Sequence, residues 1–184
     1  MKKDNDRMNP IARYLELRDR MDELSARLTA LHGENITCRE GCTACCVNFT
    51  VFPVEFHAIL SEMERDGVKP ESIPFDTTAT CGFLHEGLCR IYRYRPIICR
   101  THGLPILYLD DEGDAPEWRV SFCELNFTGE GSVEFTDETL LDIEEMNAEL
   151  YHINREFVAS LHEKNYHENA RIALKDICQK PEER

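Results

Sequence analysis

The sequence lacks the apolar segments that would carry it into or across a membrane. None of its apolar runs approaches the roughly 20 residues of a membrane-spanning helix. The stretch MKKDNDRMNPIARYLELRDR has charges where a signal peptide needs an apolar core. We therefore expect a cytoplasmic chain. In that compartment the N-x-T sequences at Asn35, Asn48 and Asn126 are not glycosylation sites, and we assign them no role.

Positive charge is also scarce. The 184 residues include 21 Lys and Arg against 35 Asp and Glu, which gives a formal net charge of -14. Most of the acidic excess follows residue 108. Because an acidic surface repels phosphate groups, we expect neither nucleic acid nor membrane as a partner, and we leave a protein partner open.

Familiar enzyme motifs are missing as well. The sequence has no P-loop, no G-x-S-x-G and no H-E-x-x-H, and Gly129-Glu-Gly131 lacks the third glycine of a dinucleotide site. Catalytic residues therefore remain unknown, and the sequence leaves open whether the protein is an enzyme.

Cysteine, in contrast, is abundant. In a reducing compartment, nine cysteines favour metal binding or catalysis over disulfides. Thiolates suit zinc or an iron-sulfur cluster, and such a site normally takes four ligands, so the eight cysteines of the central segment allow one site or two. These candidate ligands are Cys38, Cys42, Cys45, Cys46, Cys81, Cys89, Cys99 and Cys123. Cys178 lies apart, and we expect it to be a buried thiol instead.

The run CREGCTACC, residues 38–46, has the form C-x3-C-x2-C-C. A helix would place its first three thiols on one face, and a loop would fold them together with Gly41 at the turn. Four thiols in nine residues are hard to explain as core packing. The C-x3-C-x2-C part also resembles the cluster loop of radical S-adenosylmethionine enzymes, but the sequence lacks the repeated βα units of their barrel.

A second segment, CGFLHEGLCRIYRYRPIICRTHG at residues 81–103, makes the resemblance specific. Together the two segments resemble the CxxCxxCC cysteine-cluster family, the YkgJ-type zinc- or iron-chelating domain. The matching residues are Cys38, Cys42, Cys45, Cys46, Cys81, Phe83, Leu84, Gly87, Cys89, Ile91, Tyr92, Arg95, Pro96, Cys99 and Arg100. Cys123 is added by its position after a predicted hairpin. The resemblance implies a bound metal or cluster. Related domains occur in flagellin lysine-N-methylases, which implies a protein-modifying or redox enzyme as an alternative.

Arginines crowd the segment after Cys89, in an otherwise acidic protein. Ion pairing with surface carboxylates would explain most of them. Arg95 and Arg100 flank the turn before Cys99, and we predict that they face the site as cofactor-binding residues. His85 and His102 are close enough in sequence to replace a cysteine ligand, but the cysteines suffice without them.

Apolar spacing predicts a mainly α fold with a small β-hairpin, in which a loop-rich cysteine-cluster core is flanked by N- and C-terminal helices. We expect a single domain over 1–184, with an N-terminal helix at 10–32, the core at 34–123 and C-terminal helices at 137–179. The first helix has one apolar stripe, which packs within the chain or forms a two-stranded coiled coil. The stripe comprises Leu17, Met21, Leu24, Leu28 and Leu31.

Within this plan we expect a second helix at 53–65 and hairpin strands at 104–109 and 118–122. A long helix follows from 137 to 164 with Thr136 as its cap, and a last helix spans 168–178.

The sequence thus predicts a metal-binding protein that holds an iron-sulfur cluster or zinc and acts as a structural or redox module. The iron-sulfur cluster is favoured slightly, because zinc ribbons usually have two C-x2-C pairs and this chain has only Cys42-Thr-Ala-Cys45. The alternative is an enzyme with an open cluster site.

Overall fold

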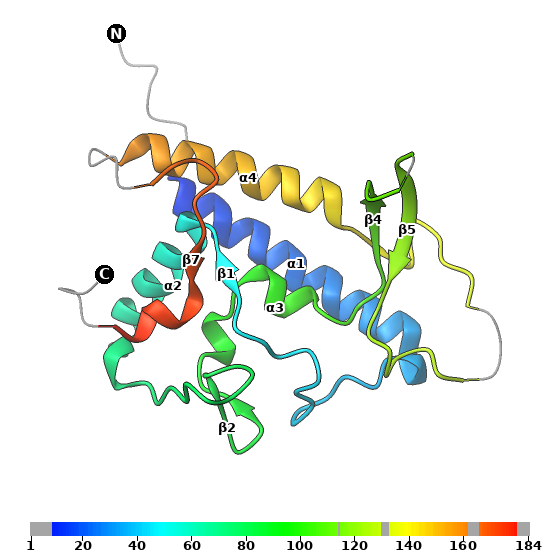
Figure 1. Ribbon diagram of the computed structural model, residues 1–184, viewed down its shortest axis with the longest axis horizontal. Helices are drawn as coiled ribbons and strands as arrows, with labels where there is room; N and C mark the ends of the chain where they lie inside the picture. Colours follow the sequence, from blue (N-terminus) through cyan, green and yellow to red (C-terminus); the bar gives the residue numbers. More distant parts are fainter. Residues whose placement is uncertain (1–8, 114, 130–132, 162–165, 180–184) are drawn as a thin grey trace, which may run out of the picture.

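The computed structural model describes residues 9–113, 115–129, 133–161 and 166–179. The chain is mainly α with small β-elements, which confirms the predicted class (Figure 1). The helices are α1 (Pro10–His32), α2 (Pro53–Arg65), α3 (Ile97–Thr101) and α4 (Ile143–Ser160). Short 3-10 helices occur at η1 (Gly33–Asn35), η2 (Pro70–Ser72), η3 (Tyr92–Tyr94) and η4 (Leu174–Cys178). In the described part of the chain, no helix is both long and apolar enough to cross a membrane.

Helix α1 begins and ends where the sequence predicts. The Asn9 side chain caps it by accepting a hydrogen bond from the Ile11 N–H at 3.0 Å, and the chain leaves the helix at Gly33 with φ +52°. The helix packs against α2, α3 and α4, so its apolar stripe is covered within the chain. Leu31 is the exception at 55% exposure, because the buried face passes from Leu28 to His32, one turn later.

Helix α2 separates two apolar clusters. On one face, Val54 and Ala58 join a cluster formed with α1, α3 and α4. On the other, Phe56, Ile59 and Met63 join a second cluster, which η3 and η4 complete. The loops that carry most of the cysteines lie on the side of the molecule away from α4 (Figure 1).

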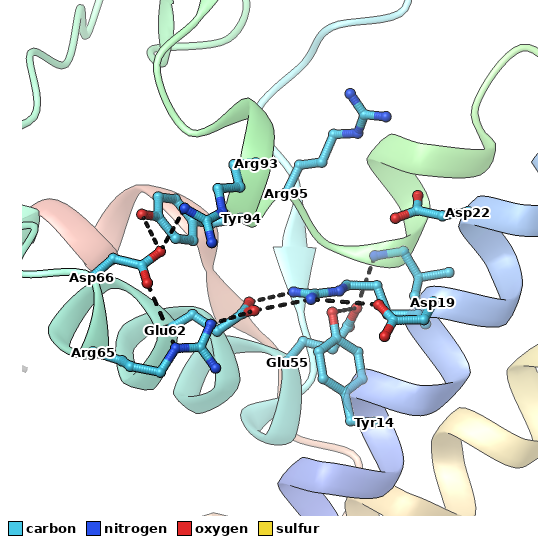
Figure 2. Close-up of polar contacts among 12 residues, drawn as sticks. Tyr14, Asp19, Asp22, Glu55, Glu62, Arg65, Asp66, Arg93, Tyr94 and Arg95 are labelled. Carbon is cyan, nitrogen blue, oxygen red and sulfur yellow. Dashed lines mark hydrogen bonds and ion pairs between the residues drawn. The ribbon is translucent and has the colours of Figure 1, made fainter.

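A buried ion pair also joins α1 to α2. Arg18 is paired with Glu62, and each side chain is only about a tenth exposed. Nearby, the Tyr14 hydroxyl donates to Glu55 at 3.4 Å. Figure 2 shows Tyr14, Glu55 and Glu62 in this polar layer between the helices.

Three small sheets complete the fold. The predicted hairpin is confirmed as β4 (Ile106–Asp110) paired antiparallel with β5 (Glu117–Ser121). Strand β6 (Leu141–Asp142) adds to β4 in parallel. The two others pair β2 (Leu84–His85) with β3 (Leu88–Cys89), and β1 (Thr50–Val51) with β7 (Ile172–Ala173).

The long C-terminal helix starts later than predicted. Its cap is Asp142, which accepts from the N–H groups of Glu144 and Glu145 at 3.0 and 3.1 Å, and Thr136 lies in a preceding turn. Strand β6 occupies the residues just before the helix, because β4 offers them backbone partners that the helical pattern does not reveal. The predicted end of this helix, at 162–164, lies outside the described residues.

The prediction of a last helix over 168–178 is wrong. Ile172 and Ala173 form β7, with Val51 opposite Ile172, and the chain then turns into the 3-10 helix η4. The Leu174 N–H also donates to the Phe49 carbonyl at 3.0 Å. The open edge of β1 thus holds this segment extended, and a β-branched residue such as Ile172 favours that state.

Candidate metal centre

The first cysteine run is a loop, which is the second of the two conformations considered from the sequence. Its turns are closed by hydrogen bonds from the Cys42 N–H to the Arg39 carbonyl at 2.9 Å and from the Cys46 N–H to the Thr43 carbonyl at 3.0 Å. Gly41 has φ +87°, a conformation that side chains other than glycine rarely adopt. The turn therefore depends on Gly41.

Asn126 fixes this loop to two distant segments, and it was not among the site residues predicted from the sequence. Its Oδ1 accepts from the Thr37 N–H at 2.9 Å, while its Nδ2 donates to the Gly103 carbonyl at 2.8 Å and lies 3.7 Å from the Cys38 sulfur. The side chain is buried. Its position three residues after Cys123 was the available signal, which the N-x-T reading hid.

Gly103 brings Cys38 and Cys123 to the same place. A Cβ on Gly103 would lie 3.3 Å from the Cys38 sulfur and 3.5 Å from the Cys123 Cβ, so both cysteines are in contact range of this glycine. Gly103 also has φ +91°. Two thiols that are far apart in sequence therefore meet across one backbone position.

The β2–β3 hairpin organises other cysteines. Leu84 pairs with Cys89 across it, and its N–H donates to the Cys81 carbonyl at 3.0 Å. Asn48 reaches from the first run and accepts from the Gly82 N–H at 3.0 Å. A side chain at Gly82 would collide with the Phe75 ring. The hairpin is thus held against the end of the first run.

Electrostatic effects group four thiols around the first run. Burial raises the pKa of Cys38, and the charges of Cys42 and Cys123 raise it further. Burial also raises the pKa of Cys45 to about 11, followed by repulsion from Cys46 and then from the other three thiols. We call Cys38, Cys42, Cys45 and Cys123 the first thiol set.

The remaining four form a second group. Burial raises the pKa of Cys46, and its largest thiol repulsions come from Cys81 and Cys89, ahead of that from Cys42. Burial raises the pKa of Cys99 to about 12, with further repulsion from Cys89, Cys81 and Cys46. We call Cys46, Cys81, Cys89 and Cys99 the second thiol set.

The two arginines predicted to bind a cofactor have different surroundings. Arg100 is bound to Asp22 and donates to the carbonyls of Arg93 and Arg95, both at 2.7 Å, so it braces the turn before α3. Arg95 lies over the Tyr92 ring at 3.7 Å, and its buried Nε has no hydrogen-bond partner in the described part of the chain. Figure 2 shows the Arg95 side chain extending away from the ion pairs drawn around it.

Arg95 is also close enough to the second thiol set to affect it. Burial remains the main influence on the Cys89 and Cys99 thiols and raises the pKa of each, whereas the charge of Arg95 lowers it. A cation at this position would stabilise thiolates. The cofactor-binding role of Arg95 and Arg100 stays a prediction.

The nearby histidines have other contacts. His85 accepts a hydrogen bond from Arg90 at 2.8 Å. The ring of His102 lies 5.6 Å from that of Phe49. Cys178, predicted to be a buried thiol, is partly buried and packs against the second apolar cluster.

A cavity adjoins the first thiol set. Its volume is about 540 Å³, and Cys45, Cys123 and His102 are among the residues that line it. The buried carboxyl of Glu55 and the guanidinium of Arg171 contribute charged groups to the same wall. This size is within the range of small-molecule sites.

The donor set fits zinc or iron in chemistry, although the thiols are not yet arranged around an ion. All eight cysteines from Cys38 to Cys123 are free thiols, and soft thiolates are ligands that both metals accept. Among the described residues, no three Cys, His, Asp or Glu side chains are close enough to hold a metal ion. Binding would therefore draw the thiols of a set closer together.

Comparison with known proteins agrees with the cysteine pattern. Residues 37–124 match the model of the CxxCxxCC family, which is described as a "Putative zinc- or iron-chelating domain". No curated protein and no solved structure matches the chain significantly. The matched segment begins one residue before Cys38 and ends one residue after Cys123, so it contains every candidate ligand. The resemblance is confirmed over this segment, because residues 37–124 are similar to the CxxCxxCC family model.

Proposed function

We propose that this chain binds metal through cysteine thiolates, that the metal is an iron-sulfur cluster or zinc, and that the protein serves as a structural or redox module. The observation that carries the proposal is the convergence of eight thiols from four separate segments of the chain. Partial burial, and then repulsion from neighbouring thiols, raises the pKa of five of them, Cys38, Cys45, Cys46, Cys89 and Cys99. A bound cation removes that repulsion, which favours metal binding over eight isolated thiols.

Of the two metals, we favour the iron-sulfur cluster. The first run is a loop with a single C-x2-C pair and lacks the paired knuckles of a zinc ribbon. Cluster ligands drawn from dispersed loops are compatible with such a site.

Elemental analysis and a visible absorption spectrum of the anaerobically purified full chain test this proposal. We expect iron and acid-labile sulfide in stoichiometric amounts, with a coloured protein. A colourless protein with stoichiometric zinc would keep the metal-binding function and reverse the choice of metal. A reduced, folded chain that contains neither metal and takes up neither on titration would contradict the function itself.

The cavity beside Cys45 and Cys123 favours a second candidate function, a protein-modifying or redox enzyme with an open cluster site. A structural site is closed by its ligands, whereas a catalytic one keeps a position open towards a pocket. Cyanide, added to the reduced iron-loaded protein, should then change the electron paramagnetic resonance spectrum. Replacing Ile98, which lines the cavity, by Trp should block that change. An unchanged spectrum of the unmodified chain would favour the structural or redox module.

A further inference from the structure

We propose that the first and second thiol sets are two separate metal sites, divided between the adjacent residues Cys45 and Cys46. This inference rests on the proposed function, because it assigns the ligands of the metal centre proposed above. A four-cysteine site is complete by itself for zinc or an iron-sulfur cluster, and each set supplies four thiols.

The first set is assembled around Gly103. Cys38 and Cys123 approach this glycine from two sides, with its virtual Cβ 3.3 Å from the Cys38 sulfur. The Cys123 N–H donates to the Gly103 carbonyl at 3.3 Å, and Asn126 binds the same carbonyl through its side chain. These contacts fix one end of the first run against the residue that follows the β4–β5 hairpin.

Cys45 joins this set through the cavity. It is one of the residues that line the cavity, as are Cys123 and Gly103. Cys42 lies between Cys38 and Cys45 in the turn-rich loop, where Gly41 reverses the chain. Cys38 and Cys123 thus meet at Gly103, Cys45 and Cys123 line one cavity, and Cys42 belongs to the same loop as Cys38 and Cys45.

The second set is assembled around the β2–β3 hairpin. The hydrogen bond between Asn48 and Gly82 places the chain just after Cys46 beside the chain just after Cys81. The hairpin then returns Cys89 to the same region, since Cys89 pairs with Leu84. Cys81 and Cys89 both pack against the second apolar cluster, away from the cavity.

Cys99 reaches this set from α3. Arg100, the next residue of α3, donates to the carbonyls of Arg93 and Arg95, so α3 is held against the segment that follows Cys89. After burial, repulsion from Cys89, Cys81 and Cys46 raises the pKa of Cys99, which agrees with this placement. The sets adjoin at Cys45 and Cys46, which are consecutive residues, and among the thiols Cys46 raises the pKa of Cys45 most.

The division predicts that two neighbouring substitutions, Cys45→Ser and Cys46→Ser, each remove one metal site, but not the same one. Metal-free full chain is loaded with Zn²⁺ under anaerobic conditions, and the bound metal is counted by elemental analysis. We expect each variant to bind half as much Zn²⁺ as the unmodified chain. Cys178→Ser is the matched control, and it should keep the full amount.

Thiol alkylation, mapped by mass spectrometry, identifies which ligands each variant releases. In Cys45→Ser the rest of the first set should become reactive while the second set stays protected, and Cys46→Ser should give the reverse. Cys123→Ser and Cys89→Ser repeat the test at positions distant in sequence, in case the central loop does not tolerate a change. Circular dichroism confirms that each variant is folded.

The outcomes separate this inference from the function on which it rests. If the unmodified chain takes up no metal, the proposed function fails. If it takes up metal but Cys45→Ser and Cys46→Ser expose the same thiols, or if either releases all the metal, one shared site replaces two and only the division is overturned.

Discussion

The buried amide of Asn126 holds three backbone segments beside Cys38. Asn126→Ala would leave the Thr37 N–H and the Gly103 carbonyl without this partner and would remove a buried side chain. We expect a loss of about 1–3 kcal/mol in the free energy of unfolding of the metal-free protein. Urea denaturation measures it.

The exposed Asn147 on α4 provides the control for this substitution. Asn147→Ala should change stability by less than about 0.5 kcal/mol. The loss of Asn126 should also weaken metal binding by the first thiol set more than by the second. Equal stability of the two variants would show that Asn126 does not hold the loop.

The raised pKa values of two thiols also predict how metal affinity depends on pH. Burial and neighbouring thiols raise the pKa of Cys45 to about 11 and that of Cys99 to about 12, so both are protonated near neutral pH. Metal binding must displace those protons. Affinity for Zn²⁺ should therefore rise with pH, about tenfold per pH unit for each thiol that loses a proton.

Isothermal titration calorimetry in buffers of different ionisation enthalpy counts the protons released. The folding stability of the metal-free protein should change with pH in the opposite direction to the metal affinity. Because folding raises these thiol pKa values, it favours the protonated forms, and that stability is lost as pH rises from about 8.5 towards the folded values of Cys45 and Cys99. Metal affinity that does not change between pH 6 and 8 would contradict thiolate ligation by protonated cysteines.

At the scale of whole elements, the buried pair of Arg18 and Glu62 fastens α1 to α2. Glu62→Ala would leave the buried Arg18 charge with only the longer contact to the exposed Asp19, at 3.7 Å, and should cost about 3 kcal/mol of folding free energy. Glu149→Ala is the matched control, because its pair with Arg20 also joins two helices but is exposed. We expect at most about 1 kcal/mol there. Thermal and urea unfolding compare the two variants.

The double substitution Arg18→Met with Glu62→Leu tests the reason for this difference. Removing both charges should restore most of the stability that Glu62→Ala loses, since no unpaired charge remains. A double variant as unstable as Glu62→Ala would show that packing, and not the buried charge, accounts for the effect.

Elements with a strong local signal were the ones that could be predicted from sequence. The Asn9 cap and Pro10 set the start of α1, and periodic apolar residues set α2. The predictions for the start of α4 and for the segment around Ile172 were wrong, because the structure of both depends on backbone pairing with β4 and β1. Such pairing joins distant parts of the chain, and residue periodicity does not record it.

The candidate ligands show the same difference between local signals, which the sequence reveals, and long-range contacts, which it does not. The candidates could be named from thiol spacing, whereas the proposed division into two sets depends on which loops meet at Gly103 and Gly82. Asn126 and Asn48, which bring those loops together, have no local signature of their own.

For the whole molecule, we predict that metal and folding of the central segment are linked. Residues 34–123 contain long loops around the thiols, and ligands from the first run and the β2–β3 hairpin would close those loops by cross-linking them. Removal of metal by a chelator should expose residues 37–49 and 76–96 to protease. Helices α1 and α4 should keep most of their circular dichroism signal, since apolar packing holds them.

Limited proteolysis with peptide mapping, before and after chelation, measures this protection. Helix α2 lies within the central segment but is buried on both faces, so it serves as an internal control that should resist cleavage in both states. Equal protection of the two loops with and without metal would show that the cysteines do not hold the segment together, and a labile or catalytic site would be the better interpretation.

The pairing of β1 with β7 sets an order for biosynthesis. Because translation runs from the N-terminus, all eight candidate ligands are synthesised before α4, and β7 is made later still. The nascent chain thus contains all eight candidate ligands before it contains β7, the strand that pairs with β1 after the cysteine loop. Metal delivered during synthesis would therefore reach the cysteine loop before β7 has paired with β1.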